Sequence, residues 1–537
     1  MRTFGISRVH NSSVSILEDG DLTFHLENER LSNIKYDGYP FHVLESIKHI
    51  PDHICLAGVG KTPNGECFSD DDMYSIFIKH RHANDNIETH DFWNIHHKLH
   101  AAHAFYNSGF DEALCIVKDG MGSEVKLNNK NFLPGSYGRE ISSTFLASYP
   151  DNFIEIDKHI AVPFECNMFQ NGIRVSNNLS EAMAFQIVSK HFGFHSLDAG
   201  KVMGMSSYGK LDSNIPPIYK DGFINNELFS LRGDLRKSYL NVNNFPYLKG
   251  EEEYIKFNLA YKLQKETQEE VGRYILKMIE KTGCKNVCLS GGFFLNCVAN
   301  YYYLSILPKN INLYIEPVSN DAGTSIGAAK YFWHSKTKST DIKKLNSLYL
   351  GGQYNIPKEG KPTSYEEVCN LLISGKIVAI YQGRSESGPR ALGNRSILFD
   401  PRNPNAKDII NRIKRREWFR PFAGTIIEEY ASQYFDMRGL NESPFMMYAV
   451  KVLTDKIPGI THIDNTCRIQ TVNQNQNNHF YNLILKFYEK TGIPILFNTS
   501  FNLAGECMVE TPDDAIKTLR KSEIDYLYFP ENQTLME

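Results

Sequence analysis

The sequence lacks the cysteine patterns that mark disulfide frameworks and structural zinc sites. Its ten cysteines are spread along 537 residues and form no CxxC pair. The closest two, Cys284 and Cys288, flank a predicted buried strand and are expected to be core thiols. This distribution is typical of a reducing compartment, so we expect a cytoplasmic protein.

Long apolar runs and a strong net charge are also missing. No run of about 18 apolar residues exists that would span a membrane, and the first ten residues lack the apolar core of a signal peptide. The formal net charge is −4, so no basic field recruits polymeric nucleic acid or an anionic membrane. No internal repeat is visible, and the length suits two or more domains.

Histidines, in contrast, are concentrated in one segment, residues 91–122. His96 and His100 are four residues apart in a stretch rich in alanine that is expected to be helical. Residues i and i+4 share one helical face, so the two imidazoles can converge on one metal ion. A solvated helix face with scattered histidines is the alternative interpretation.

Two carboxylates at the ends of predicted buried strands favour the metal site. The strand over residues 112–117 ends at Asp119, and the glycine that follows lets a phosphate approach the backbone. A second strand, residues 311–315, leads to Asp321 at the start of a predicted helix. Asp321 fits an N-cap position, and it is also well placed to join His96, His100 and Asp119 around one ion.

Two glycine-containing segments are candidates for nucleotide binding. The predicted strand over residues 286–289 opens into Ser290-Gly291-Gly292, where a helix should begin, a geometry that binds phosphate on backbone amides. Residues 200–209 have three glycines and are expected to form a loop in which Lys201 meets phosphate. An ordinary turn is the alternative for this second segment. The candidate nucleotide-binding residues are Gly120, Lys201, Gly204, Gly291, Gly292 and Asn296.

The N-terminal residues predict a β-hairpin sheet. Strands are expected over residues 3–9, 14–17 and 22–26, with a turn at Asp19-Gly20 and a polar turn that begins at His10. By analogy, acetate-kinase/actin-like nucleotide-binding folds begin in this way. The charged residues 27–30 form either a rim of the site or a solvated edge.

Arginines dominate the last third of the chain. A polar segment, residues 335–355, is expected to be a linker, and beyond it guanidinium groups recur beside glycine, proline and aromatic residues. The planar arginine side chain suits a small phosphate or carboxylate. A nucleic-acid groove or a solvated basic face is the alternative, and Lys414-Arg415-Arg416 alone favours a solvated helix face. The interleaved Trp418, Pro421 and Phe422 indicate that packing holds some of these arginines in place.

The order of these motifs resembles the O-carbamoyltransferases of the nodulation-factor, cephamycin and tobramycin type. The resemblance covers nearly the whole chain and is most specific in HHKLHAAHAF, GKVMGMSSYGK, LSGGFFLNC, NDAGTSIGAA, SESGPRALGNRSI, REWFRPFAG, THIDNTCRIQTV and ILFNTSFN. Residues 140–179 hardly resemble the family, and they are expected to help shape the acceptor pocket.

The resemblance implies an α/β protein of two domains. Residues 1–345 are expected to form an acetate-kinase/actin-like domain similar to the tRNA threonylcarbamoyl transferase subunit, which binds nucleotide and metal and carries out carbamoyl transfer. Residues 350–537 are expected to form an α+β, YrdC-like domain that binds carbamoyl phosphate and makes carbamoyl-adenylate.

Site roles also follow from the resemblance. His96, His100, Asp119 and Asp321 match the family's ligands to iron(II), which another divalent metal could replace, and His97 and His103 are then supporting residues. His10 matches the active-site histidine. Carbamoyl phosphate is assigned to Arg390, Lys414, Arg420, Arg468, Asn498 and Ser500, of which Arg390, Lys414 and Arg420 join His10 as catalytic residues.

The activity implied is ATP-dependent transfer of a carbamoyl group from carbamoyl phosphate, through carbamoyl-adenylate, to a hydroxyl of a small molecule, with magnesium accompanying ATP. A sugar, an antibiotic or a hydroxymethylated nucleotide would fit as acceptor, and we expect a monomer or homodimer. The alternative is a sugar-kinase-like or ATPase protein of the same superfamily, but such a protein has no need of the arginine-rich second half. A regulatory protein with degenerate motifs is disfavoured because no predicted metal ligand is missing.

Overall fold

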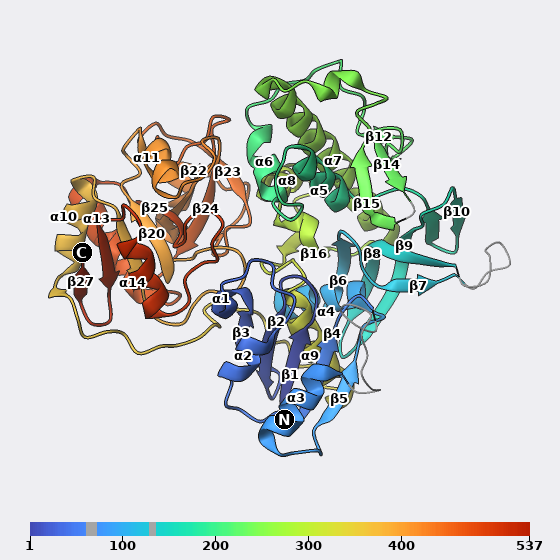
Figure 1. Ribbon diagram of the computed structural model, residues 1–537, viewed down its shortest axis with the longest axis horizontal. Coiled ribbons are helices and arrows are strands. Elements are labelled where there is room, and N and C mark those ends of the chain that lie inside the picture. The colour runs from blue at the N-terminus through green and yellow to red at the C-terminus, as the bar shows by residue number, and fades with distance from the viewer. Residues whose placement is uncertain (61–71, 128–135, 233) are drawn as a thin grey trace. The chain divides into compact units, whose positions relative to one another are not determined.

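The computed structural model describes residues 1–60, 72–127, 136–232 and 234–537 (Figure 1). The chain divides into two compact units. The first contains Met1–Asn28 and Asp37–Leu345, and the second contains Glu29–Tyr36 and Asn346–Glu537. Residues 29–36, which the sequence analysis assigns to the first domain, therefore pack with the second unit.

The first sheet of unit 1 is built around β1 (Arg2–Ser7). Its strand order is β3-β2-β1-β4-β5, with β2 (Ser13–Glu18) and β3 (Asp21–Glu27) antiparallel and β4 (His53–Ala57) and β5 (Glu88–Asp91) parallel to their neighbours. The predicted hairpin is present, and Gly20 in its turn has a φ of +86°.

The second sheet repeats this connectivity around β6 (Glu112–Lys118). Within the order β10-β11-β9-β8-β6-β16-β17, the run from β9 to β17 has two antiparallel pairings followed by two parallel ones. A duplicated unit of this kind is the acetate-kinase/actin-like architecture that the resemblance implies. The strands are β8 (Tyr137–Ser148), β9 (Asn152–Ala161), β10 (Asn167–Gln170), β11 (Ile173–Ser176), β16 (Asn286–Ser290) and β17 (Asn312–Ile315).

Two helices carry the histidine and aspartate motifs of unit 1. Helix α4 (His96–Ser108) follows β5, and α9 (Gly323–Thr337) packs against α4, β1 and β2. Their close approach depends on Gly327, because a Cβ there would overlap the carbonyl oxygen of Leu99. The other helices of the unit are α2 (Phe41–Ser46), α3 (Met73–His82), α5 (Glu181–His191), α6 (Ala199–Ser206), α7 (Glu253–Thr282) and α8 (Cys297–Ile306).

The prediction of a glycine loop over residues 200–209 is wrong. Most of it forms α6, whose Val202, Met203 and Met205 are buried and which packs against α5 and α7. Burial of these apolar side chains outweighs the cost of about 1 kcal/mol that each glycine adds to a helix.

Unit 2 contains a mixed ten-stranded sheet and confirms the α+β class expected for this part of the chain. The strand order is β18-β27-β26-β19-β20-β25-β21-β24-β23-β22. The outer strands are β18 (Lys361–Pro362), β22 (Phe435–Asp436), β23 (Ala449–Val452), β26 (Tyr526–Phe529) and β27 (Thr534–Met536). Helix α13 (Asn478–Thr491) packs on β21 and β25, burying Phe480, Leu483 and Phe487 completely. The central strands are β19 (Val378–Tyr381), β20 (Arg395–Phe399), β21 (Ala423–Ile427), β24 (Thr466–Val472) and β25 (Ile495–Ser500), and the other main helices are α10 (Tyr365–Ile373), α11 (Ala406–Ile413) and α14 (Pro512–Arg520).

Among the described residues, none of the helices combines the length and the apolar character needed to cross a membrane.

Candidate functional site

The first turns of α4 bring two imidazoles together. The Nε2 atoms of His96 and His100 are 3.2 Å apart, and both side chains are fully buried. The i, i+4 spacing places them on one face of the helix, and this face is not solvated. The alternative of scattered surface histidines is therefore wrong for this pair.

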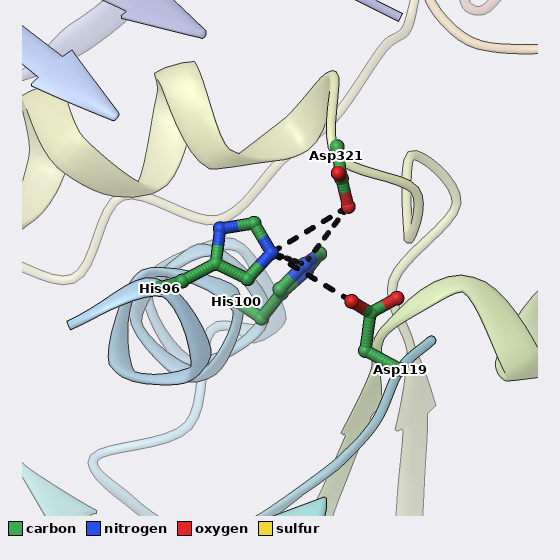
Figure 2. A group of neighbouring side chains, drawn as sticks. All are labelled: His96, His100, Asp119 and Asp321. Carbon is green, nitrogen blue, oxygen red and sulfur yellow. Dashed lines mark hydrogen bonds and ion pairs between the residues drawn. The ribbon is translucent and has the colours of Figure 1, made fainter. Parts of the chain in front are cut away.

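Two carboxylates face these imidazoles from the ends of other elements (Figure 2). Asp119 directly follows β6, and its Oδ2 lies 3.7 Å from His96 Nε2. Asp321 lies two residues before α9, and its Oδ1 is 3.6 Å from His96 Nε2 and 3.5 Å from His100 Nε2. One ligand atom from each of the four residues lies within 4.8 Å of the others.

The donor set suits one divalent ion. Two ligand atoms that each lie about 2.1 Å from one ion are about 3.0–3.4 Å apart at tetrahedral or octahedral angles. The distances from His96 Nε2 to His100 Nε2 and to the Asp119 and Asp321 oxygens, and from His100 Nε2 to Asp321, are close to this, at 3.2–3.7 Å. Burial opposes charge on His96, yet Asp321 and Asp119 raise its pKa to about 10. The same negative field would stabilise a metal cation. Asp321 has no capping role, because Ala322 occupies the N-cap position without a side-chain hydrogen bond.

Neighbouring groups fix the orientation of these side chains. Ser290 Oγ lies 3.4 Å from His100 Nδ1, and the amide of Gly292 donates to Asp119 Oδ1 over 3.2 Å. The other two histidines of α4 point elsewhere: His97 Nδ1 pairs with Ser143 Oγ at 2.8 Å, and His103 Nε2 lies 3.3 Å from Glu316 Oε1. Supporting partners of this kind hold ligands in one tautomer and direction.

His10 is the exposed member of this centre. It follows β1, its Nδ1 lies 3.3 Å from Asp321 Oδ2, and 45% of its side chain is exposed, against 4% for Asp321. Burial raises the pKa of Asp321, but the charges of His10 and His96 and the hydrogen bonds from His96 and His100 hold it well below its usual value. His10 thus connects the buried centre with solvent.

The predicted nucleotide loop after β16 adjoins Asp119. Gly291 has a φ of +99°, and a Cβ there would overlap the carbonyl oxygen of Lys118, so the chain requires glycine at this position. Gly292 contributes the amide that binds Asp119. Asn296 caps α8 by accepting from the amide of Ala299 at 3.1 Å, so its carbonyl oxygen has a structural partner.

The remaining nucleotide candidates are arranged less favourably. Lys201 on α6 pairs with Asp198 at 2.9 Å and lies 4.7 Å above the ring of Phe194. Gly204 is buried within the same helix. Gly120 is buried, and its carbonyl oxygen accepts a hydrogen bond from Ser180 Oγ at 3.2 Å. Lys201 therefore already has an anionic partner.

In unit 2, sheet register brings two predicted anion ligands to one place. Ala423, the first residue of β21, pairs with Arg468 on β24 and with Asn498 on β25. Among the described residues, Arg468 Nε and Asn498 Oδ1 are buried and have no hydrogen-bond partner. Buried polar atoms are normally paired, so these two atoms indicate that a polar ligand belongs here.

Further cations lie near this end of the sheet. Lys414 is 3% exposed and donates to the carbonyl oxygens of Ser500 and Asn502, the latter at 2.8 Å. Burial lowers the pKa of Lys414 well below its usual value, and the charges of Arg416 and Arg420 lower it further. Arg420 Nη1 lies 3.4 Å from Glu417 Oε2. A bound anion would reduce the repulsion among Lys414, Arg416 and Arg420.

Arg416 is a member of the cluster that the sequence analysis leaves out. Its guanidinium lies 4.0 Å above the ring of Phe422 and its Nε donates to Asn411 Oδ1 at 2.6 Å. Burial lowers its pKa, as do the charges of Arg420 and Arg468. The solvated face expected from Lys414-Arg415-Arg416 is wrong for Lys414 and Arg416. The available signal was the interleaved Phe422, which indicates packing.

Arg390 lies in a loop that one carboxylate organises. Glu386 Oε1 accepts hydrogen bonds from the backbone amides of Leu392, Asn394 and Arg395 at 2.7, 2.8 and 3.1 Å. The loop meets β25 where Asn498 Nδ2 donates to the carbonyl oxygen of Ala391 at 3.3 Å. Arg390 therefore belongs to a loop that contacts Asn498, and Glu386 is a second residue of this candidate site that the sequence analysis leaves out.

Comparison with known proteins identifies the family of this chain. Residues 72–330 match the family model described as Carbamoyltransferase N-terminus, and residues 369–535 match Carbamoyltransferase C-terminus. An uncharacterized protein of Synechocystis is 30% identical, over 81% of this chain and 74% of that protein, and the nodulation protein NolNO of Sinorhizobium fredii is 30% identical, over 80% and 62%. Among solved structures, HypF of T. kodakarensis is 12% identical over 63% of this chain and 47% of HypF, with a TM-score of 0.34. The chain belongs to the carbamoyltransferase family and is an enzyme that transfers carbamoyl groups.

Proposed function

We propose that this enzyme takes its carbamoyl group from carbamoyl phosphate, activates it with ATP as carbamoyl-adenylate, and transfers it to a hydroxyl of a small molecule. The observation that carries the proposal is the presence of two chemically different centres. One is a cluster of arginines and a lysine beside unpaired Arg468 Nε and Asn498 Oδ1. The other is a buried set of two imidazoles and two carboxylates. Each centre suits one half of a two-step transfer.

Carbamoyl phosphate fits the first centre by its chemistry. Its phosphate carries the negative charge that Arg468, Arg420 and Lys414 can bind, and its carbamoyl amide can donate to the free Oδ1 of Asn498. Arg390 and Ser500 complete the proposed binding set, and Arg416 joins it. Bringing these cations together without an anion is unfavourable, as the lowered pKa values of Lys414 and Arg416 indicate.

In the first half-reaction, one water molecule attacks the phosphorus of carbamoyl phosphate, the P–O bond to the carbamoyl group breaks, and phosphate and carbamate are formed. The carbamate then attacks the α-phosphorus of ATP, and pyrophosphate leaves with the bonding electrons, which gives carbamoyl-adenylate. Carbamate is unstable in water, so Lys414, buried at 3% exposure, and its arginine neighbours should also keep bulk solvent away from the carbamate. Magnesium accompanies ATP as its usual counter-ion.

The second half-reaction belongs to the centre in unit 1. The acceptor oxygen attacks the carbamoyl carbon, AMP leaves, and the hydroxyl proton must be removed. His10 is suited to accept that proton, because its ring is 45% exposed and its Nδ1 is oriented by Asp321 at 3.3 Å. Gly291 and Gly292 present a backbone that a nucleotide can approach, next to Asp119.

A divalent ion, iron(II) in our proposal, would be held by His96, His100, Asp119 and Asp321. When bound, it would supply Lewis-acid stabilisation of negative charge on oxygen. Imidazole and carboxylate donors without thiolates suit iron(II) as well as other divalent ions. The donor separations and the negative charge of Asp321 and Asp119 beside His96 support a divalent ion at this place.

The two half-reactions can be tested separately. Arg468→Ala should abolish consumption of carbamoyl phosphate but retain transfer from carbamoyl-adenylate supplied ready-made. His100→Ala should have the opposite effect and lose bound metal. Arg412→Ala, at an arginine with 70% exposure paired to Glu523, is the matched control and should retain both steps. Loss of both steps in each variant, with the fold intact, would contradict the division of labour.

A further inference from the structure

A second set of possible metal ligands lies on the first sheet of unit 1, away from the buried centre. His53 is on β4, and Glu88 and His90 are on the neighbouring edge strand β5. The parallel register pairs His53 with Glu88 and Cys55 with His90. Glu88 and His90 are two residues apart on a strand, so their side chains share one face of the sheet.

The three donor atoms form a nearly regular triangle. His53 Nδ1 lies 3.2 Å from Glu88 Oε2, His90 Nε2 lies 3.7 Å from the same oxygen, and the two ring nitrogens are 3.4 Å apart. Three ligands bound about 2.1 Å from one tetrahedral ion would be about 3.4 Å apart. The side chains are therefore already at the spacing that a shared ion would require.

Packing holds both rings in this arrangement. The ring of His90 stacks on Phe332 with 4.1 Å between centroids, and His53 packs against the same ring at 4.9 Å. The side chain of Glu88 is 57% exposed, which leaves an open side where water can complete the coordination.

A cation already lies beside these donors. Lys336 Nζ is 3.1 Å from Glu88 Oε2, and the lysine side chain is 43% exposed, so it can move away at little cost. The ammonium group thus occupies the position of a positive ion that Glu88 would otherwise bind.

We propose that His53, Glu88 and His90 form a second divalent-cation site of the zinc class, with two nitrogens, one oxygen and water as ligands. Two histidines, a glutamate and a water are a common ligand set for zinc with an open position. The ion would cross-link β4 to the edge strand β5. Strand β5 ends at Asp91, whose carboxylate accepts two hydrogen bonds from Arg8, at 2.7 and 2.8 Å, and the chain then enters α4 at His96. An ion here would stiffen the segment that leads to the buried centre.

Zinc titration of the full-length protein tests this site. In the His100→Ala variant, whose buried centre is weakened, we expect about one equivalent of zinc to bind and to raise the melting temperature. Both the zinc binding and the rise in melting temperature should be lost when Glu88→Gln or His90→Ala is added. Lys336→Met should tighten zinc binding severalfold, because the competing cation is removed. His49→Ala, at an exposed histidine outside the cluster, is the matched control and should bind zinc like its parent.

Two results would overturn the proposal. If Glu88→Gln, a substitution at a side chain that is 57% exposed, bound zinc as tightly as its parent, the cluster would not be a metal site. Unchanged affinity in Lys336→Met would show that Lys336 and zinc do not share Glu88. Neither result depends on carbamoyl transfer, so both are distinct from a failure of the proposed function.

Discussion

At the scale of single residues, Gly291 has the strictest backbone requirement near the proposed nucleotide and metal centre. Gly291→Ala would force a side chain into a φ of +99° and against the carbonyl oxygen of Lys118, next to Asp119. We expect a loss of about 2–4 kcal/mol in the free energy of unfolding and weaker metal binding. Gly283→Ala, with a φ of +69° and nothing within 4 Å, isolates the backbone cost of about 1 kcal/mol. Equal losses in the two variants, measured by urea unfolding, would contradict this interpretation.

Glu386 is the residue on which the Arg390 loop depends. Glu386→Ala removes the acceptor of three backbone amides, and each unsatisfied buried donor costs about 1–3 kcal/mol. We expect Arg390 to lose its position and the KM for carbamoyl phosphate to rise about tenfold or more, while transfer from supplied carbamoyl-adenylate is retained. Glu359→Ala, at an exposed glutamate, is the control. A normal KM in Glu386→Ala would mean that the loop holds its shape without this carboxylate.

Residue chemistry predicted the buried quartet better than the anion cluster. An i, i+4 histidine pair must lie on one helical face, and carboxylates at the ends of parallel strands in one sheet lie at one edge of that sheet. The structure brings all four side chains together. Arg416 escaped prediction because three consecutive basic residues usually mark a solvated face. Only the fold shows that Lys414 turns inward to bind the carbonyl oxygens of Ser500 and Asn502.

At the scale of elements, buried histidines make unit 1 sensitive to acid. Burial lowers the pKa of His159 on β9 to about 3 and that of His334 on α9 to about 4. An unfolded histidine binds its proton near pH 6.5, whereas these two remain neutral in the folded chain. The contribution of these two histidines to the free energy of unfolding should therefore be constant above about pH 6.5 and fall as the pH drops toward 4, by up to about 1.4 kcal/mol per pH unit for each histidine.

Urea unfolding at pH 7 and pH 5 measures this effect. His159→Gln, which can still reach Ser176, should reduce the difference between the two pH values by about 1–2 kcal/mol. His49→Gln, at an exposed histidine, is the control and should leave the difference unchanged. The same pH dependence in His159→Gln and in the parent would exclude His159 as a source of acid sensitivity.

Element boundaries followed from local sequence signals, except where packing overrides them. Predicted strands at residues 112–117 and 286–289 correspond to β6 and β16 within a residue at either end, because continuous apolar runs mark buried strands. Helix α6 was missed because its glycines indicate a loop, while the buried faces of Val202 and Met205 depend on α5 and α7, which are distant in sequence.

At the scale of the whole molecule, residues 29–36 join the second unit across more than 300 residues of chain. Arg30 forms a buried ion pair with Glu510 at 3.1 Å, with exposures of 3% and 0%. No local pattern could predict this pairing, and the sequence left residues 27–30 as either a rim or a solvated edge. For Arg30 the solvated edge is wrong.

This pairing has a consequence for dissecting the enzyme. A fragment of residues 350–537 would leave Glu510 buried without Arg30, at a cost of about 3–5 kcal/mol. We expect this fragment to be unstable, to be rescued in part by Glu510→Gln, and to be stabilised by an added peptide covering residues 29–36. A fragment as stable without the peptide as with it would show that Arg30 contributes nothing to the second unit.

Carbamoyl transfer to a hydroxyl can be measured by product analysis with carbamoyl phosphate, ATP and a library of hydroxylated metabolites. We predict that one compound gains a carbamoyl group by mass spectrometry, with AMP and pyrophosphate formed in equal amounts, and that omitting either carbamoyl phosphate or ATP abolishes the gain. A phosphorylated product with ADP, formed equally well without carbamoyl phosphate, would contradict the proposed function and favour a sugar-kinase-like activity.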